Sequence, residues 1–164
     1  MDDVAAAVGS FGAQSGFLFT LGANEALTLA SGTSLEIDAR AANFALDRAI
    51  NAGSNTLAIS STGNITQSAP LLAANLLLMG TGGVFALDNA GNDIDTLAAN
   101  TGSFTLADSD SVSVGTVNGA VGVHLSGGGN TTISASNAID VTQPIVSTGQ
   151  GSLTLHADAS ATDN

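Results

Sequence analysis

The chain contains no cysteine, tryptophan, tyrosine or lysine, and its only basic residues are Arg40 and Arg48. Without cysteine, disulfides and thiolate metal sites are excluded. Fourteen acidic residues give a formal net charge of −12, and such a surface repels phosphate backbones and anionic lipid headgroups. The most apolar run, residues 69–79, is about half the length needed to span a bilayer. We therefore expect neither nucleic-acid binding nor membrane insertion.

The start of the chain also lacks the features of a secretory signal. Met1, Asp2 and Asp3 are acidic or neutral where a signal peptide needs a basic region before its apolar stretch. If the mature protein is extracellular, we expect the chain to be a fragment of a longer precursor or to leave the cell by a different route.

Short apolar triplets with period two run through most of the chain. Period two indicates strands with one buried face, and an interval of about 8–12 residues is typical of a sandwich, a barrel or a solenoid. Glycine, asparagine, serine and aspartate separate the triplets and favour turns. The triplets begin at Leu27, Leu35, Phe44, Leu57, Leu76, Phe85, Phe104, Val112, Val123, Ile139 and Leu153.

Internal repeats favour the solenoid. Residues 50–59 match 146–155, residues 59–72 match 133–146, and residues 102–106 match 151–155. Such degenerate copies indicate a coil in which each rung, one complete turn of the chain, buries its apolar patch by stacking on the next. At roughly 20 residues per rung we predict about eight rungs and a rod on the order of 40 Å long.

Two segments fit the repeats less well. Residues 38–51 are rich in alanine and open to a helical interpretation, but the alternation of Phe44 and Leu46 favours a strand. Residues 1–22 match no repeat, and we predict that they form an N-terminal cap or docking segment, followed by solenoid repeats over residues 23–164. An uncovered end rung would offer unpaired strand groups to any neighbour, so a cap or docking role suits this segment.

Several longer phrases carry a family resemblance. Residues 87–100 (LDNAGNDIDTLAAN), 110–117 (DSVSVGTV), 63–67 (GNITQ) and 149–155 (GQGSLTL) together resemble the repeats of large bacterial adhesins of the filamentous-haemagglutinin type. That resemblance implies an all-β, right-handed parallel β-helix, exported by two-partner secretion and displayed outside the cell or on the bacterial surface. It covers residues 53–164 best, and it implies no catalytic residue and no cofactor.

Residues 88–95 hold the densest cluster of oxygen ligands. Calcium requires six to eight converging oxygens, and the nonapeptide calcium repeat does not occur in the sequence. We therefore predict turns and stacked ladders here rather than a metal site. A calcium ion would have to use Asp88, Asn92, Asp93 and Asp95, with Asn89 beside them.

Other polar groups give little support for catalysis. β-Helical enzymes that act on acidic polysaccharides need basic groups for the substrate, and this chain offers only two arginines. We predict that Asp108 and Asp110 form a solvated turn and that His124 and His156 face outward from strands. Gly127 to Gly129 lack the lysine of a phosphate loop and are predicted to form a turn.

These observations predict a non-enzymatic structural and adhesive module of a bacterial surface adhesin. Its partners would be neighbouring rungs of a longer chain, other solenoid subunits, or a receptor on a host or bacterial surface. The alternative is a filament or matrix subunit that stacks end to end, with Phe17, Leu18 and Phe19 docking on a neighbour's open rung.

Overall fold

The computed structural model describes residues 27–29, 31–32, 34–41 and 43–158. This part of the chain contains strands and no helix, and hence no helix long and apolar enough to cross a membrane. The strands are β1 (Leu27–Thr28), β2 (Leu35–Arg40), β3 (Phe44–Leu46), β4 (Ile50–Ser61), β5 (Asn64–Gln67), β6 (Leu71–Leu87), β7 (Asp93–Asp108), β8 (Val112–Val114), β9 (Thr116–Val117), β10 (Ala120–Val121), β11 (Val123–Leu125), β12 (Thr131–Ala135), β13 (Ile139–Val141), β14 (Ile145–Ser147) and β15 (Leu153–His156).

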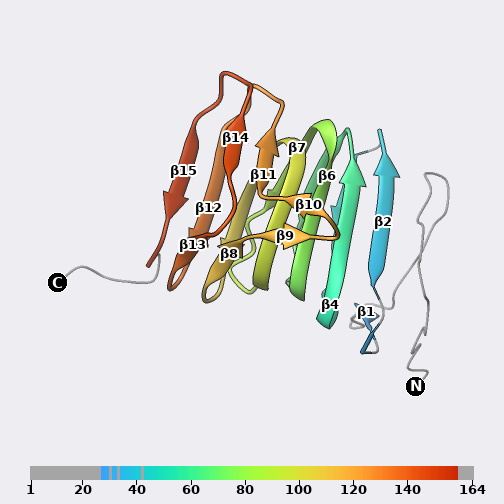
Figure 1. The fold of residues 1–164 in the computed structure, drawn as a ribbon. Coiled ribbons are helices and arrows are strands. Elements are labelled where there is room, and N and C mark those ends of the chain that lie inside the picture. The colour runs from blue at the N-terminus through green and yellow to red at the C-terminus, as the bar shows by residue number, and fades with distance from the viewer. Residues whose placement is uncertain (1–26, 30, 33, 42, 159–164) are drawn as a thin grey trace.

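Thirteen of these strands form one sheet whose pairings are all parallel, and the sheet winds into a β-solenoid (Figure 1). The predicted fold is therefore confirmed. The first rung holds β1 to β3 and the last holds β13 to β15, at opposite ends of the stack. The segment 38–51 contains the end of β2, all of β3 and the start of β4, so its strand interpretation is also confirmed.

The core consists of columns of apolar side chains, one from each rung. The column that starts at Leu35 has six members, so the described residues make six rungs rather than the predicted eight. A second six-membered column passes from Ile37 to Ile145. The first column is Leu35, Leu57, Leu76, Leu97, Val114 and Val141; the second is Ile37, Ile59, Leu78, Ala99, Val123 and Ile145.

The rung count differs from eight for two reasons. Steps along the second column are 22, 19, 21, 24 and 22 residues, most of them longer than the 20 assumed. In addition, residues 1–26 and 159–164 lie outside the described part of the chain. At a strand spacing of ~4.8 Å, six rungs form a stack of about 25–30 Å.

The register shows which sequence repeats are structural. Residues 102–106 and 151–155 lie two rungs apart in the same columns, because Leu106 pairs with Ile133 and Ile133 pairs with Leu155. The match of Ile50 with Val146 is not in register, since Ile50 aligns with Leu71 and Val146 with His124. The match of residues 50–59 with 146–155 therefore reflects similar strand-and-corner sequences that lie at different positions around the coil.

One corner of the coil requires glycine because successive rungs approach closely there. A Cβ on Gly102 would lie 2.6 Å from the Gly83 carbonyl oxygen, and a Cβ on Gly127 would lie 2.8 Å from the Gly102 oxygen. At Gly149 the distance to the Gly127 oxygen would be 1.6 Å. The glycines at 127–129 thus form the predicted turn, and they also let one backbone rest on the next.

Serine and threonine close the corners with paired hydrogen bonds. In five places a hydroxyl residue donates both its backbone N–H and its side-chain O–H to one carbonyl of the preceding rung. These bonds satisfy strand-end carbonyls that the sheet leaves open. The pairs are Thr62 with Arg40, Ser126 with Thr101, Ser136 with Asp108, Thr142 with Val114, and Thr148 with Leu125.

Candidate functional site

A β-hairpin interrupts the otherwise regular fifth rung. Strands β9 and β10 pair antiparallel around Asn118 and Gly119, whose φ angles are 49° and 84°. Positive φ at both central residues is typical of the type I′ turn that joins tight hairpins, and Asn-Gly is its preferred sequence. We did not predict this hairpin, although the Asn-Gly pair between Val117 and Val121 is the signal for it.

The hairpin covers the outside of the sheet (Figure 1). The Val117 side chain is only 2% exposed and packs with Leu77 and Ala98, which point away from the main core. Ala58, Met79 and Ala120 complete this second, smaller apolar cluster. The hairpin therefore stands on a core of its own on the outer surface of β6 and β7.

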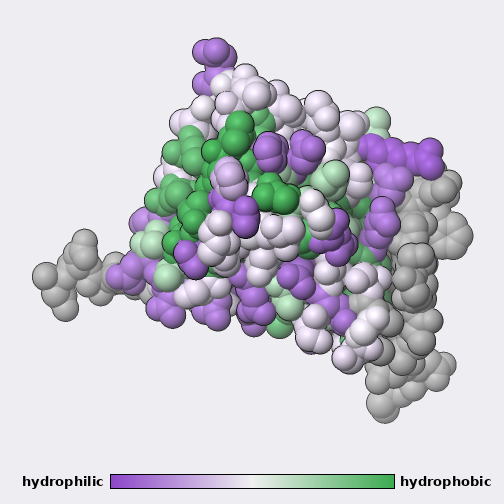
Figure 2. All heavy atoms as spheres, viewed as in Figure 1, coloured by the Kyte–Doolittle hydropathy of each residue, from purple (hydrophilic) through white to green (hydrophobic). Residues whose placement is uncertain are grey.

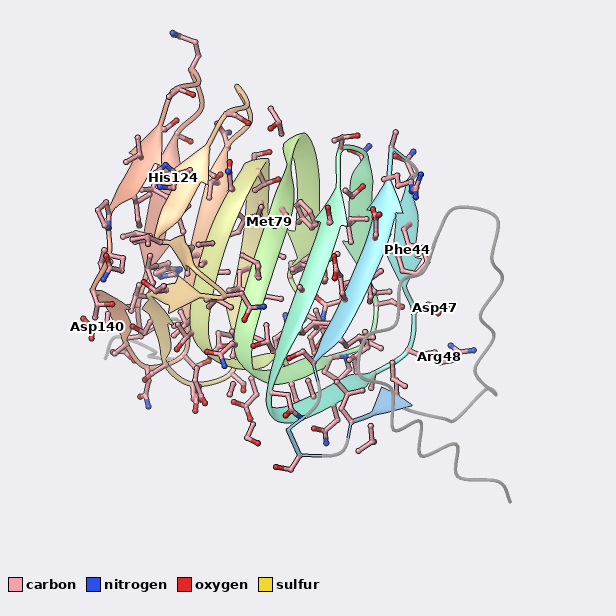
Figure 3. The ribbon with its side chains drawn as sticks, turned by 45° about the vertical axis from the view of Figure 1, so that its right-hand side comes forward. Phe44, Asp47, Arg48, Met79, His124 and Asp140 are labelled. Carbon is pink, nitrogen blue, oxygen red and sulfur yellow. The ribbon has the colours of Figure 1, made fainter. Side chains whose placement is uncertain are left out.

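The far side of the hairpin is open to solvent. Val121 is 45% exposed, and the exposed His124 ring places its Nε2 3.2 Å from the Val121 carbonyl oxygen. In the sheet register His124 lies between Asn100 and Val146, and Met79 precedes Asn100 (Figure 3). We call the exposed residues Val121, His124 and Val146 the hairpin surface. It combines apolar contact area with one imidazole.

The predicted outward orientation of His124 and His156 is confirmed, since both are exposed on strands. The two arginines pair locally: the Arg40 Nε lies 3.6 Å from Asp38 and the Arg48 Nη1 lies 3.9 Å from Asp47. Both arginines lie in or beside the first rung. Figure 3 shows Arg48 on the opposite side of the view from His124.

Asn92 is completely buried at a corner, where its amide joins several segments. Its Oδ1 accepts hydrogen bonds from the Gln67 amide and, at 2.9 Å, from the Leu71 N–H. Its Nδ2 donates to the Ala107 and Leu87 carbonyls at 3.0 and 3.1 Å and to the Gln67 side chain at 3.2 Å. These bonds occupy the amide within the protein, and Asn92 acts as a corner brace.

The remaining calcium candidates do not converge. Asp88, Asp93 and Asp95 are exposed, and among the described residues no group of three or more histidine or acidic side chains could hold a metal ion. Asn89 makes a local turn, because its Oδ1 accepts the Gly91 N–H at 2.9 Å. Two of the carboxylates line a shallow groove of about 300 Å³ formed by Asn51, Gly53, Leu72, Ala73, Ala74, Asp93 and Asp95.

Asp108 is buried, so its predicted place in a solvated turn is wrong; only Asp110 is exposed. One carboxylate oxygen accepts the Ile94 N–H at 2.8 Å, and the other accepts the Asp110 N–H at 3.1 Å. Burial raises the pKa of Asp108 to about 6, the two N–H donors oppose that rise, and the neighbouring Asp110 adds to it. The burial of Asp108 could not be predicted from the sequence, because an Asp-Ser-Asp triplet is also typical of an exposed turn.

The cap at residues 1–22 and the docking residues Phe17, Leu18 and Phe19 lie outside the described residues. In the described part, every buried side-chain nitrogen and oxygen has a hydrogen-bond partner. Comparisons with protein-family models, with curated proteins and with solved structures found no match.

Proposed function

We propose that the chain is a non-enzymatic structural and adhesive module of an extracellular or surface-displayed bacterial adhesin. The observation that carries this proposal is the continuity of the apolar columns through all six rungs, including the fifth rung that holds the hairpin. Six rungs share apolar columns, and every buried side-chain polar atom in the described region is satisfied. Such a stack supplies length and surface, because repeat architectures extend by adding rungs to a continuous core.

The composition supports an exposed, extracellular setting. The net charge of −12 keeps the rod soluble, and the absence of cysteine leaves nothing to oxidise to a disulfide outside the cell. The resemblance to filamentous-haemagglutinin repeats points to the same setting. For adhesion, the hairpin surface is the best-placed contact area, since Val121 and Val146 are 45% and 41% exposed there.

An experiment on cells of the source organism tests the location. Gold-labelled antibody raised against the purified chain should decorate intact cells or material around them. Labelling that appears only after the cells are permeabilised would overturn the extracellular proposal. Turnover of a polysaccharide by the purified chain, lost on substitution of one aspartate, would overturn the non-enzymatic part.

A second candidate function is a subunit of an end-to-end filament or matrix. The specific observation in its favour is that exposed apolar side chains gather in the last rung, where four large ones are at least 41% exposed: Val141, Val146, Leu153 and Leu155. Figure 2 shows apolar side chains over these C-terminal rungs, on the left of the view.

A further inference from the structure

We infer that Asn118 is a site of spontaneous covalent modification, at which the side-chain amide is lost and the residue becomes isoaspartate. The reaction joins Asn118 to the backbone nitrogen of Gly119 and uses water as its one co-reactant. The inference stands apart from the proposed function, because it rests on the geometry of the β9–β10 hairpin and on the chemistry of an asparagine that precedes glycine.

The two reacting groups lie at an open tip and are not held by other contacts. Asn118 and Gly119 are exposed and have φ angles of 49° and 84°. Neither the Asn118 side-chain amide nor the Gly119 N–H forms a hydrogen bond with a described residue. Apart from its chain neighbours, no atom lies within 4 Å of a Cβ placed on Gly119, so nothing crowds the approach of its nitrogen to the Asn118 side chain.

The other asparagines lack one or both of these conditions, and in the whole sequence Asn118 is the one asparagine that glycine follows. At four positions the next residue is isoleucine, leucine, threonine or alanine, whose side chain hinders attack by the backbone nitrogen: Asn64, Asn75, Asn100 and Asn137. Among the described residues, six further asparagines use the side-chain oxygen to accept a backbone N–H: Asn43, Asn51, Asn55, Asn89, Asn92 and Asn130.

The reaction has two steps, and its atoms balance. In the first, the Gly119 backbone nitrogen gives up its proton to the solvent and attacks Cγ of Asn118. The Cγ–Nδ2 bond breaks, the departing nitrogen takes up a proton and leaves as ammonia, and a cyclic succinimide remains. In the second, water opens the ring: cleavage of the Gly119 nitrogen from Cγ gives aspartate, whereas cleavage from the main-chain carbonyl carbon gives isoaspartate. One water is consumed, one ammonia is released and no electron is transferred.

The hairpin allows the ring to close without disturbing the solenoid. Attack requires rotation about the backbone of Asn118, away from the type I′ conformation. Strands β9 and β10 have two residues each, and in the described part of the chain they pair only with one another. The tip can therefore open locally while the apolar columns of the fifth rung keep their neighbours in the fourth and sixth rungs.

Isoaspartate at position 118 removes the turn that holds the hairpin together. Its backbone runs through Cβ and Cγ and is longer by one CH2 group, so the two-residue type I′ turn can no longer form. Val117, which is 2% exposed in the intact hairpin, then leaves the small cluster that it forms with Leu77 and Ala98. The converted chain also carries one negative charge more than the original net charge of −12.

Peptide mapping by mass spectrometry of the full chain, sampled during storage in neutral buffer, tests the inference. A protease that cleaves before aspartate releases residues 110–139, which hold Asn118 together with Asn130 and Asn137 as internal controls. The same protease cuts before aspartate at position 118 and not before isoaspartate, so it distinguishes the two products. Gly119→Ala places a side chain beside the attacking nitrogen, and Asn118→Asp supplies the added charge in an unaltered backbone.

Asn118 should be converted before any other described asparagine, mostly to isoaspartate, and Gly119→Ala should slow the conversion by on the order of tenfold. The converted chain, separated from the original chain by anion exchange, should melt at a lower temperature than Asn118→Asp, because Asp-Gly also favours the type I′ turn.

The urea-unfolded chain sets the time scale of the experiment. An Asn118 that stays intact in the folded chain while the unfolded chain is converted would overturn the inference. Conversion of Asn130 or Asn137 first, or an equal rate in Gly119→Ala, would do the same. Equal melting of the converted chain and Asn118→Asp would overturn the loss of the hairpin. None of these results bears on whether the chain is displayed outside the cell.

Discussion

At the scale of single residues, polar side chains hold the corners that the sheet cannot close. Asn92 and Asp108 are both buried, and each accepts the backbone N–H of a residue at the start of a strand segment, Leu71 and Ile94 respectively. Their roles differ because an amide carries no charge, whereas burial of a carboxylate disfavours its ionised form. Among the described residues, Asp108 is the buried side chain that titrates, so pH acts on the interior there.

Asp108 gives a pH-dependent stability. Its pKa is about 6 in the folded chain and near 3.8 unfolded, so the cost of burying its charge is fully present above pH 6 and is relieved as the pH falls toward 4. In Asp108→Asn the side-chain oxygen can still accept the Ile94 N–H, whereas the Asp110 N–H loses its acceptor, which offsets part of the gain. We expect this variant to be more stable than wild type at pH 7 by on the order of 1–2 kcal/mol.

Urea unfolding at pH 4 and at pH 7 measures this difference. The advantage of Asp108→Asn should shrink as the pH falls from 7 to 4. Asp93→Asn removes an equal charge from an exposed position, and its difference from wild type should show no such loss. Equal pH dependence in the two variants would contradict the assignment of the effect to burial of Asp108.

A second prediction at this scale concerns the apolar columns. Leu106 is fully buried between Leu87 and Ile133. Leu106→Asp should lower the free energy of unfolding by several kcal/mol, because the new carboxylate has no charge partner in the column. Thr105→Asp, at the half-buried neighbouring position, is the control and should cost much less. Similar denaturation midpoints for the two variants would contradict the inward orientation of Leu106.

At the scale of elements, the alternation of apolar residues predicted strands reliably but did not predict the inserted β9–β10 hairpin. All eleven apolar triplets lie in or at the end of strands, because a half-buried strand imposes period two on its own sequence. The β9–β10 hairpin was not predicted because its strands have only two residues each, which is too few to show an alternating pattern. Asn118-Gly119 was the only local signal, and its meaning depends on the pairing around it.

Gly122, where the chain returns from the hairpin to the sheet, is restricted both in its backbone conformation and by a close neighbour. The φ angle there is +68°, and a Cβ would lie 2.1 Å from the Pro144 carbonyl oxygen. Gly119 at the tip has a similar φ of +84°, but no atom lies within 4 Å of its would-be Cβ. A side chain at position 119 would therefore add backbone strain alone, whereas one at position 122 would add both backbone strain and a steric clash.

We expect Gly119→Ala to cost about 1 kcal/mol from strain at positive φ. Gly122→Ala should cost about 3 kcal/mol or more, because the β11–β14 pairing must also shift. Thermal unfolding of both variants beside wild type measures this. Equal losses of stability in the two variants would mean that the Pro144 carbonyl group of the sixth rung does not exclude a side chain at position 122.

At the scale of the whole molecule, the solenoid followed from the spacing of small apolar groups, but the rung length did not. Corner residues and the hairpin add length that no strand pattern records, so eight predicted rungs became six described ones. The repeat at 102–106 and 151–155 was structural, whereas the match of Ile50 to Val146 joined different columns. Sequence similarity alone does not distinguish the two, because every strand-and-corner phrase uses the same residue types.

Buried polar residues were likewise out of reach. Asn92 and Asp108 stand in sequence segments that are typical of exposed turns. Their burial depends on which backbone N–H and C=O groups the coil brings to each corner. The apolar residues of the last rung were visible in the sequence as an ordinary triplet, Leu153 to Leu155. Their exposure is a property of the end of the stack rather than of the triplet.

The central claim is that this chain is a structural module displayed outside the cell. Gold-labelled antibody against the purified chain, applied in parallel to intact and to permeabilised cells of the source organism, tests it most directly. We predict equal labelling of the two preparations, on the cell surface or on material around the cells. Label that appears only after permeabilisation would contradict the claim.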